Sequence, residues 1–157
     1  MAEGTGRACR HEPQSPAKVP WALRYDDGMS TSEAVTRSVR VQVRAEYSPS
    51  HSQPTHNRWF FLYTILISNE GDETVQLVTR HWIITDATGH VEEVRGPGVV
   101  GQQPVLEPGR SFEYTSGCPL PSPYGSMKGA YQMVTADGTE FEAEVATFTL
   151  QAPFTVH

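Results

Sequence analysis

Hydrophobic and polar residues alternate strictly over residues 38–47 of this chain. One face of an extended segment here would carry Val39, Val41, Val43, Ala45 and Tyr47. A period of two with one polar face predicts a half-buried strand of an antiparallel sheet. Residues 48–57 are expected to form a loop. Residues 58–68 are apolar on both faces, so they predict a central strand.

Short apolar segments separated by turn-forming residues continue to the end of the chain. The strands expected from them are residues 75–85, 90–95, 111–116, 127–135 and 140–150. Turns are expected at residues 69–72 and 86–89, where Gly, Asn and Asp gather. In the last strand the apolar positions change parity after Val145, which predicts a β-bulge near Ala146 and Thr147.

Two of the turns can be assigned a type from their residues. Residues 107–110 place Pro108 and Gly109 at the two central positions, which predicts a type II turn. Asp137 and Gly138 stand between the last two strands and predict a hairpin with a type I′ turn, because this pair accepts positive φ angles.

About seven short strands with turns at this spacing predict an all-β fold, a two-sheet antiparallel β-sandwich. A chain of 157 residues with 38% hydrophobic residues is enough for one packed domain. We expect this domain to span residues 29–157. Residues 1–28 mix Pro, Gly, Ser and charges without periodicity, so a disordered N-terminal extension is expected there.

The N-terminal extension has two further interpretations. Met29 opens a segment that suits the natural start of the domain, and residues 1–28 would then come from an upstream start codon. Alternatively, Trp21, Leu23 and Tyr25 dock on the domain.

Charge and apolar runs limit the partners and the location of the protein. A net charge of −6 argues against a nucleic-acid partner, because phosphate binding needs a basic face. The longest apolar run, residues 59–67, is too short to span a bilayer, and no signal peptide is apparent. Cys9 and Cys118 are a poor disulfide framework. We therefore expect a cytoplasmic protein without a membrane partner.

A glycine-rich segment at residues 96–101 matches the G-x-G-x-x-G pattern of dinucleotide-binding loops. That chemistry needs a helix directly after the loop, and Pro104 argues against one. Consecutive backbone N–H groups can still form an anion-binding nest. The candidate ligand-binding residues are therefore Gly96, Gly98, Val99, Val100 and Gly101.

Charge for an anion at this loop would come from Arg95 or Arg110. Pro97 weakens the nest, since proline has no N–H to donate. The alternative interpretation is structural: the glycines allow a tight crossover between the sheets where side chains would clash.

Catalytic and metal-binding patterns are absent from the sequence. The six histidines lack the paired spacing of a zinc site, so no metal is expected. Residues 125–129 resemble G-x-S-x-G only superficially, and Cys118 is expected to be a loop thiol without a histidine partner. The glutamates of residues 140–144 are expected to remain solvated on one strand face. We predict no catalytic residue, no enzymatic activity and no cofactor.

Three motifs are specific enough to indicate a family. Residues 82–86 fit W-x-I-T-D, residues 96–101 fit G-x-G-V-V-G, and residues 114–117 are Tyr-Thr-Ser-Gly. In this order the segment 75–117 closely resembles the ApaG family. The resemblance covers roughly residues 39–157 and implies an immunoglobulin-like or fibronectin-type-III-like sandwich.

The resemblance implies no agreed biochemical activity. It implies a suspected phosphate or pyrophosphate site at the glycine loop, and family genes that neighbour a diadenosine tetraphosphatase suggest a dinucleoside polyphosphate. The same domain occurs in eukaryotic F-box proteins, where it is thought to recruit partners, and some members are linked to cobalt and magnesium tolerance.

The leading hypothesis is a non-enzymatic binding module that presents loops and a sheet face to a protein partner. The first alternative is a protein that binds a phosphate-bearing small molecule through the glycine loop. The second is an indirect role in divalent-cation homeostasis. A homodimer stays open, because antiparallel sandwiches have exposed edges and faces.

Overall fold

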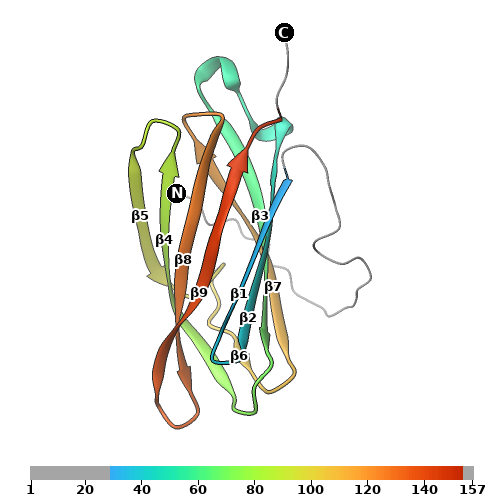
Figure 1. Ribbon diagram of the computed structural model, residues 1–157, viewed down its shortest axis with the longest axis vertical. Helices are drawn as coiled ribbons and strands as arrows, with labels where there is room; N and C mark the ends of the chain where they lie inside the picture. Colours follow the sequence, from blue (N-terminus) through green and yellow to red (C-terminus); the bar gives the residue numbers. More distant parts are fainter. Residues whose placement is uncertain (1–28, 154–157) are drawn as a thin grey trace.

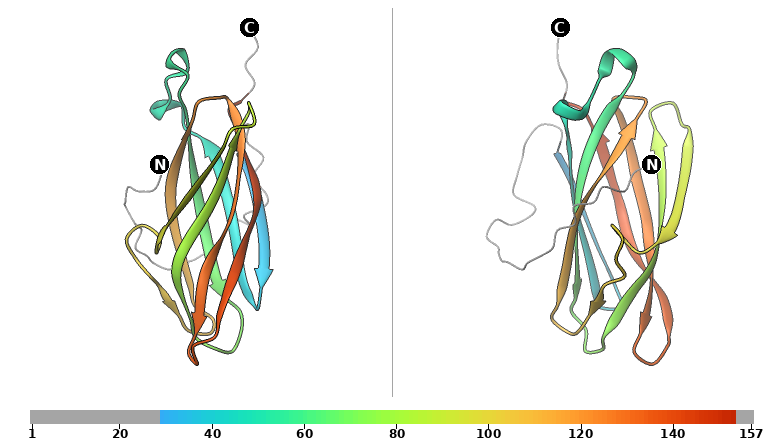
Figure 2. Two further views of the ribbon diagram at one scale, coloured as in Figure 1. Left: turned by 90° about the vertical axis from the view of Figure 1, so that its left-hand side faces the viewer. Right: turned by 180° about the vertical axis from the view of Figure 1, so that it is seen from behind.

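The computed structural model describes residues 29–153, which form two antiparallel sheets packed face to face (Figures 1 and 2). The first sheet has the order β1 (Met29–Thr36), β2 (Val39–Tyr47), β3 (Trp59–Asn69) and β7 (Ser111–Leu120). The second sheet has the order β5 (Val91–Pro97), β4 (Val75–Asp86), β8 (Tyr124–Thr135) and β9 (Glu140–Gln151). The short β6 (Val105–Leu106) also pairs with β4. The prediction of an all-β antiparallel sandwich is confirmed.

Two short 3₁₀ turns, η2 (Pro49–His51) and η3 (Pro54–His56), occupy the connection between β2 and β3. Within residues 29–153, no helix has the length and apolar character needed to cross a membrane. The predicted N-terminal extension, residues 1–28, lies outside the described residues, as do residues 154–157.

The core forms where the alternating faces of both sheets meet. On β2 the predicted inward residues from Val39 to Ala45 are buried, while their polar neighbours face outward. On β3 the inward residues from Phe61 to Ile67 are buried, and Leu62 and Leu66 on the outer face are half-buried. This two-sided apolar pattern fits the central place of β3 between β2 and β7.

Strand β1 was not expected from the sequence. Its inward face carries only Ser30, Ser32, Ala34 and Thr36, so it lacks the apolar alternation that marks the other strands. It pairs with β2 through a two-residue turn at Arg37 and Ser38, which both have positive φ angles. Small side chains, most of them with hydroxyls, thus stand at the positions where the other strands carry apolar residues.

The hydroxyls of β1 face the edge of β9 in the other sheet. Ser32 Oγ donates to the carbonyl of Ala146 at 2.8 Å, and the N–H of Glu144 donates to Thr36 Oγ1 at 3.1 Å. Ser30 Oγ donates to the carbonyl of Thr149. These bonds satisfy backbone groups on β9 that have no neighbouring strand, so β1 and β9 close one side of the sandwich.

Two β-bulges shape the second sheet. Phe148 pairs with Met127 and Val145 with Gly129, so Ala146 and Thr147 together lie opposite one residue of β8. The predicted bulge is therefore confirmed.

The second bulge was not predicted and lies in β4. Leu77 pairs with Met133 and Thr79 with Gln132, which leaves Val78 as an extra residue without a partner in β8.

The two typed turns have different outcomes. The Arg110 N–H donates to the Glu107 carbonyl at 2.9 Å and Gly109 has a φ of 86°, as a type II turn requires. In the β8–β9 hairpin, by contrast, only Gly138 has a positive φ, so the predicted type I′ turn is wrong.

The carboxylate of Asp137 explains the turn that forms instead. It accepts hydrogen bonds from the Thr135 hydroxyl and from the N–H of Thr139, which hold the loop in a three-residue form that ends in Gly138. These bonds, the one from Thr135 first, also lower the pKa of Asp137.

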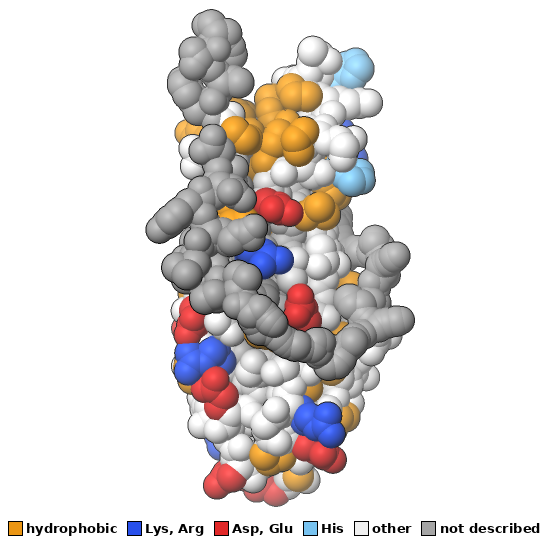
Figure 3. Space-filling model, turned by 90° about the vertical axis from the view of Figure 1, so that its right-hand side faces the viewer, with side chains coloured by type: hydrophobic (Ala, Val, Ile, Leu, Met, Phe, Trp, Pro, Cys, Tyr) orange, Lys and Arg blue, Asp and Glu red, His pale blue; other side chains and the backbone are white. Residues whose placement is uncertain are grey.

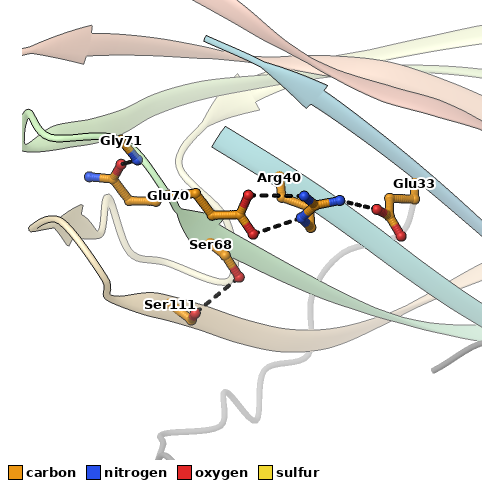
Figure 4. A network of polar contacts seen from close by, with 7 residues as sticks. Glu33, Arg40, Ser68, Glu70, Gly71 and Ser111 are labelled. Carbon is orange, nitrogen blue, oxygen red and sulfur yellow. Dashed lines mark hydrogen bonds and ion pairs between the residues drawn. The ribbon is translucent and has the colours of Figure 1, made fainter. Parts of the chain in front are cut away.

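A polar network ties the β1–β2 hairpin to the turn after β3 (Figure 4). The Arg40 guanidinium donates to both oxygens of Glu70, at 2.7 and 3.0 Å, and also to Glu33. The bond with Glu70 is the largest cause of the raised pKa of Arg40, and it lowers the pKa of Glu70. Nearby, the buried Asn69 side chain donates to the carbonyls of Glu73 and Leu106.

Replacing Ser32 by Ala leaves the carbonyl of Ala146 without its donor. We expect the free energy of unfolding to fall by about 1 kcal/mol in urea titrations. Thr31→Ala, an exposed position on the opposite face of β1, is the matched control and should change it by less than about 0.5 kcal/mol. Equal losses in the two variants would show that the Ser32 hydroxyl contributes nothing to the closure.

Candidate functional site

The glycine-rich loop follows β5 and folds back against the bulge of β4. The carbonyl of Val78 accepts hydrogen bonds from the N–H of Gly98 at 2.8 Å and from Gln103 Nε2 at 2.9 Å. The N–H of Leu77 donates to the carbonyl of Pro104 at 3.0 Å. The bond from Gly98 continues the β4–β5 register by one residue beyond Thr79 and Pro97, so the loop begins as an extension of β5 beside the bulged part of β4.

The tip of the loop is a tight two-residue turn between Val99 and Gln102, whose N–H and carbonyl groups bond each other at 2.8 Å in both directions. The central residues Val100 and Gly101 have φ angles of 41° and 80°. A β-branched residue in the left-handed region is strained, at about 1–2 kcal/mol. The buried side chain of Val99 and the core contact of Val100 help to hold this geometry.

The five predicted nest residues lie together but do not all present donors. Gly96 lies within β5, opposite Arg80. The N–H groups of Gly98 and Val99 donate to backbone carbonyls of the protein. Among residues 29–153, no backbone carbonyl accepts from the N–H of Val100 or Gly101. The loop therefore keeps two adjacent donors, both at its tip.

The two glycines of positive φ in this loop differ in the space that a side chain would have. A Cβ on Gly98 would lie 2.3 Å from the carbonyl oxygen of Gln102, whereas a Cβ on Gly101 would meet nothing within 4 Å. Gly98 is thus required by packing and by backbone conformation together, and Gly101 by conformation alone.

The positive charge at the loop comes from Arg80, which the sequence analysis did not select. Arg80 Nη1 donates to the carbonyls of Pro97 and Gly98 at 3.0 and 2.9 Å. The guanidinium lies across Gly96, where an added Cβ would be 2.9 Å from Nη2. The alternation along β4 could have identified Arg80, because Arg80, Trp82 and Ile84 follow one another at every second position and share the inward face.

The two arginines expected to supply charge lie elsewhere. Arg95 is exposed on the outer face and pairs with Glu93 at 3.2 Å, and Arg110 is exposed in the turn before β7. Glu93 also contacts His81 Nε2 at 3.2 Å. The bonds with His81 first, and then with Arg95, lower the pKa of Glu93.

Aromatic motif residues meet between the sheets beside Arg80. The Trp82 ring packs edge-on against Tyr63, Tyr131 and Phe148, with ring centroids 5.6 to 6.1 Å apart. The hydroxyls of Tyr114 on β7 and Tyr131 on β8 are 2.6 Å apart and join the two sheets. The W-x-I-T-D and Tyr-Thr-Ser-Gly motifs therefore face the same part of the interior.

Two buried polar atoms of these motifs have no hydrogen-bond partner among the described residues. They are Nε1 of Trp82, a residue that is 2% exposed, and Oγ of Ser116, which is 3% exposed. Such groups cost about 1–3 kcal/mol each when nothing binds them, so each needs an explanation.

Within residues 29–153, strand β7 pairs with β3 alone and so has an open edge on the side away from β1 and β9. The Asn69 N–H donates to the Arg110 carbonyl across the β3–β7 ladder. Since hydrogen-bonded pairs alternate along an antiparallel ladder, the N–H groups of Glu113, Thr115 and Gly117 point away from β3. None of them donates to a backbone carbonyl within residues 29–153.

The remaining candidate residues lie apart from the glycine loop in sequence and make contacts of their own. Cys118 is a buried residue of β7 and not the expected loop thiol. The His51 ring packs against the Phe60 ring in a tilted arrangement, with ring centroids 5.4 Å apart. On the face shown in Figure 3, basic side chains lie next to acidic ones.

Across residues 29–153, no three His, Cys, Asp or Glu side chains form a group that could hold a metal.

Comparisons with known proteins give one consistent result. A family model described as the ApaG domain matches residues 49–135, from η2 to the end of β8. Protein ApaG of Rhodospirillum centenum is 60% identical over 119 residues, which cover 76% of this chain and 92% of that protein. Protein ApaG of Bradyrhizobium diazoefficiens is 56% identical over 120 residues, with the same two shares.

A solved structure shows the same architecture. The crystal structure of the putative ApaA protein from Bordetella pertussis superposes with a TM-score of 0.72 at 50% sequence identity. The match covers 74% of this chain and 95% of that one.

The contrast between the two glycines is testable. Gly101→Ala should lower the free energy of unfolding by about 1–2 kcal/mol, the cost of a left-handed alanine. Gly98→Ala should cost clearly more, since the Gln102 carbonyl must also move by several tenths of an ångström. Urea unfolding of both variants measures the difference. Equal costs would mean that the loop adjusts freely and that Gly98 has no packing role.

Proposed function

The chain belongs to the ApaG domain family, and on this premise we propose that it is a non-enzymatic binding module that takes up an extended segment of a partner protein. The observation that supports this proposal is the open edge of β7. An extended segment can add a strand to such an edge, with main-chain hydrogen bonds for affinity and alternate side chains for specificity.

The edge of β7 differs from the other edges of the sandwich. β1 and β9 close each other through side-chain hydroxyls. The edge of β5 carries Glu92, Glu93, Arg95 and Pro97, the residue types that oppose strand addition. β7 is ten residues long and has a single charged residue, Glu113. Pro119, which has no N–H, limits pairing to the part before it.

Contacts on the outer face of the first sheet hold this edge in place. The hydroxyls of Thr64 and Thr115 are 2.8 Å apart across the β3–β7 ladder. The ring of Phe60 lies on Gly117, where an added Cβ would be only 2.3 Å from Cζ. A pre-formed edge of this kind loses little entropy when a partner strand pairs with it.

Thr115 offers a matched pair of variants for testing the edge. Thr115→Pro removes one outward N–H, whereas Thr115→Val removes the hydroxyl contact with Thr64 and keeps the N–H. Twelve-residue peptides selected on the full chain by phage display would serve as probes, with affinity measured by calorimetry.

We expect Thr115→Pro to weaken binding at least about tenfold, or about 1.4 kcal/mol, and Thr115→Val to bind as the unchanged protein does. Amide exchange should slow at Glu113, Thr115 and Gly117 when peptide is bound. Selection of no peptide, or protection confined to another surface, would refute the proposal.

A second candidate function is binding of a phosphate-bearing small molecule, such as pyrophosphate or a dinucleoside polyphosphate, at the glycine loop. It is supported by the two adjacent N–H groups of Val100 and Gly101 at the tip, with Arg80 behind the loop. Of the predicted nest residues, Val100 and Gly101 would donate to the phosphate, whereas Gly96, Gly98 and Val99 would only shape the loop.

Gly101→Asp and Gly101→Asn separate charge from shape at this tip. Both side chains have the same size, and both residue types tolerate positive φ. Pyrophosphate should raise the unfolding midpoint of the unchanged protein and of Gly101→Asn, but not of Gly101→Asp, in a thermal-shift titration. The absence of any saturable shift with the unchanged protein at millimolar pyrophosphate would remove this candidate.

A further inference from the structure

The outer face of the first sheet carries a group of apolar residues at one end. Phe60 and Leu62 point outward from β3, since the residue between them, Phe61, is buried in the core, and both are half-buried. Their ladder partners on β7 are Pro119 and Gly117, which are also half-buried. An antiparallel sheet commonly has polar residues on the face turned away from the core. We call Phe60, Leu62, Gly117 and Pro119 the outer patch.

The start of β1 lies in the same cross-strand row as the outer patch. Met29 pairs with Glu46 of β2, and Glu46 pairs with Leu62 of β3. Leu62 is therefore two strand spacings from Met29, or about 10 Å, and Gly117 is three spacings away, or about 14 Å. The chain that precedes Met29 thus enters the domain beside the outer patch.

The sequence ahead of β1 has an alternation that suits the face of a sheet. Trp21, Leu23 and Tyr25 stand at every second position, with Ala22 and Arg24 between them. In an extended segment the three large side chains share one face, because successive side chains point to opposite sides. Such a segment offers a row of apolar side chains to one surface and keeps the charge of Arg24 in water.

The length of chain before Met29 decides which surface this segment can reach. Residues 26–28 are Asp-Asp-Gly, which favour a turn. An extended chain spans at most about 3.3 Å per residue, so Tyr25 lies within about 13 Å of Met29 and Trp21 within about 26 Å. Both limits include the outer patch. A strand added beside β7 would lie four spacings from β1, or about 19 Å, which is beyond the reach of Tyr25.

We propose that residues 21–25 lie across the outer patch, with the side chains of Trp21, Leu23 and Tyr25 packed on it. A tethered segment meets its site at an effective concentration on the order of millimolar, so a few apolar contacts are sufficient. This inference is independent of the proposed function, because a segment laid across the face leaves the edge of β7 open.

The size of the outer patch favours this occupant over a second copy of the chain. A stable interface between two proteins takes about 20–30 residues on each side. The outer patch has four residues, and the exposed carboxylates of Glu46 and Glu113 lie in the strands beside it. An extended segment with three large side chains matches a surface of this size.

Limited proteolysis of the full chain tests the proposal. Chymotrypsin cleaves after aromatic residues and leucine, and mass spectrometry gives the initial rate of cleavage after Trp21, Leu23 or Tyr25. A synthetic peptide of residues 16–30 is the reference. Since cleavage needs the opened form of the segment, we expect the rate in the full chain to be at least about tenfold lower than in the peptide.

Leu62→Ala and Leu66→Ala form a matched pair of variants. Both leucines are half-buried and point outward from β3, but Leu66 lies about 14 Å farther along the strand, away from the outer patch. We expect Leu62→Ala to raise the cleavage rate about fivefold or more and Leu66→Ala to leave it unchanged. Equal rates in the two variants would overturn the inference, because the segment would then not lie on the outer patch.

The indole N–H of Trp21 gives a second measurement in NMR spectra of the full chain. Trp21→Phe assigns its signal among those of the three tryptophans. We expect a heteronuclear NOE close to that of the backbone of β3, which reports order on the picosecond to nanosecond timescale. A value like that of the free peptide, with cleavage as fast as in the peptide, would show a disordered extension and refute the proposal.

Two further results would assign the segment to another surface and would also refute the proposal. Protection that disappears on dilution would show that the segment binds a second copy of the chain. Protection that is lost in Thr115→Pro but kept in Leu62→Ala would place the segment at the edge of β7.

Discussion

Backbone N–H and C=O groups of a strand that have no ladder partner need other hydrogen bonds, and this requirement determines how the loops and edge strands of this fold are placed. The carbonyl of Val78, the residue without a partner in β8, accepts hydrogen bonds from Gly98 and Gln103, which hold the glycine loop against the sheet. On the other side, hydroxyls of β1 satisfy the backbone of β9. Within residues 29–153, the outward N–H groups of β7 and those at the tip of the loop are among the backbone donors that no strand satisfies.

The family motifs contain some residues that packing explains and others that it does not. Two of their glycines are explained by packing, since a side chain at Gly98 would meet the Gln102 carbonyl and one at Gly117 would meet the Phe60 ring. Yet Trp82 and Ser116 place polar atoms in the core that packing alone does not require. An apolar residue of similar size would avoid the desolvation cost at either position. The polarity of these two residues is therefore not explained by the packing of the described residues.

The sequence predicted the parts of the fold that hydrophobic alternation and parity encode, including the sandwich and the bulge at Ala146 and Thr147. It missed β1, because an edge held by hydroxyls carries no apolar pattern. It assigned the Asp137–Gly138 turn the wrong type, because a side-chain carboxylate competed with the dipeptide preference. Arg80 was overlooked beside Arg95 and Arg110, since nearness in sequence says little about which charges meet across strands.

The closure of β9 by β1 has a consequence for how the domain can change over time. β1 is joined to the rest by a hairpin and by a few hydroxyls, and its inward face buries no large apolar side chain. Substitutions within it therefore disturb the central packing little. Across lineages, β1 should drift in sequence faster than β3 or β4 and tolerate grafted segments at its start. The strand most free to change in sequence, β1, thus lies at the opposite edge of its sheet from β7, the edge proposed to recognise a partner.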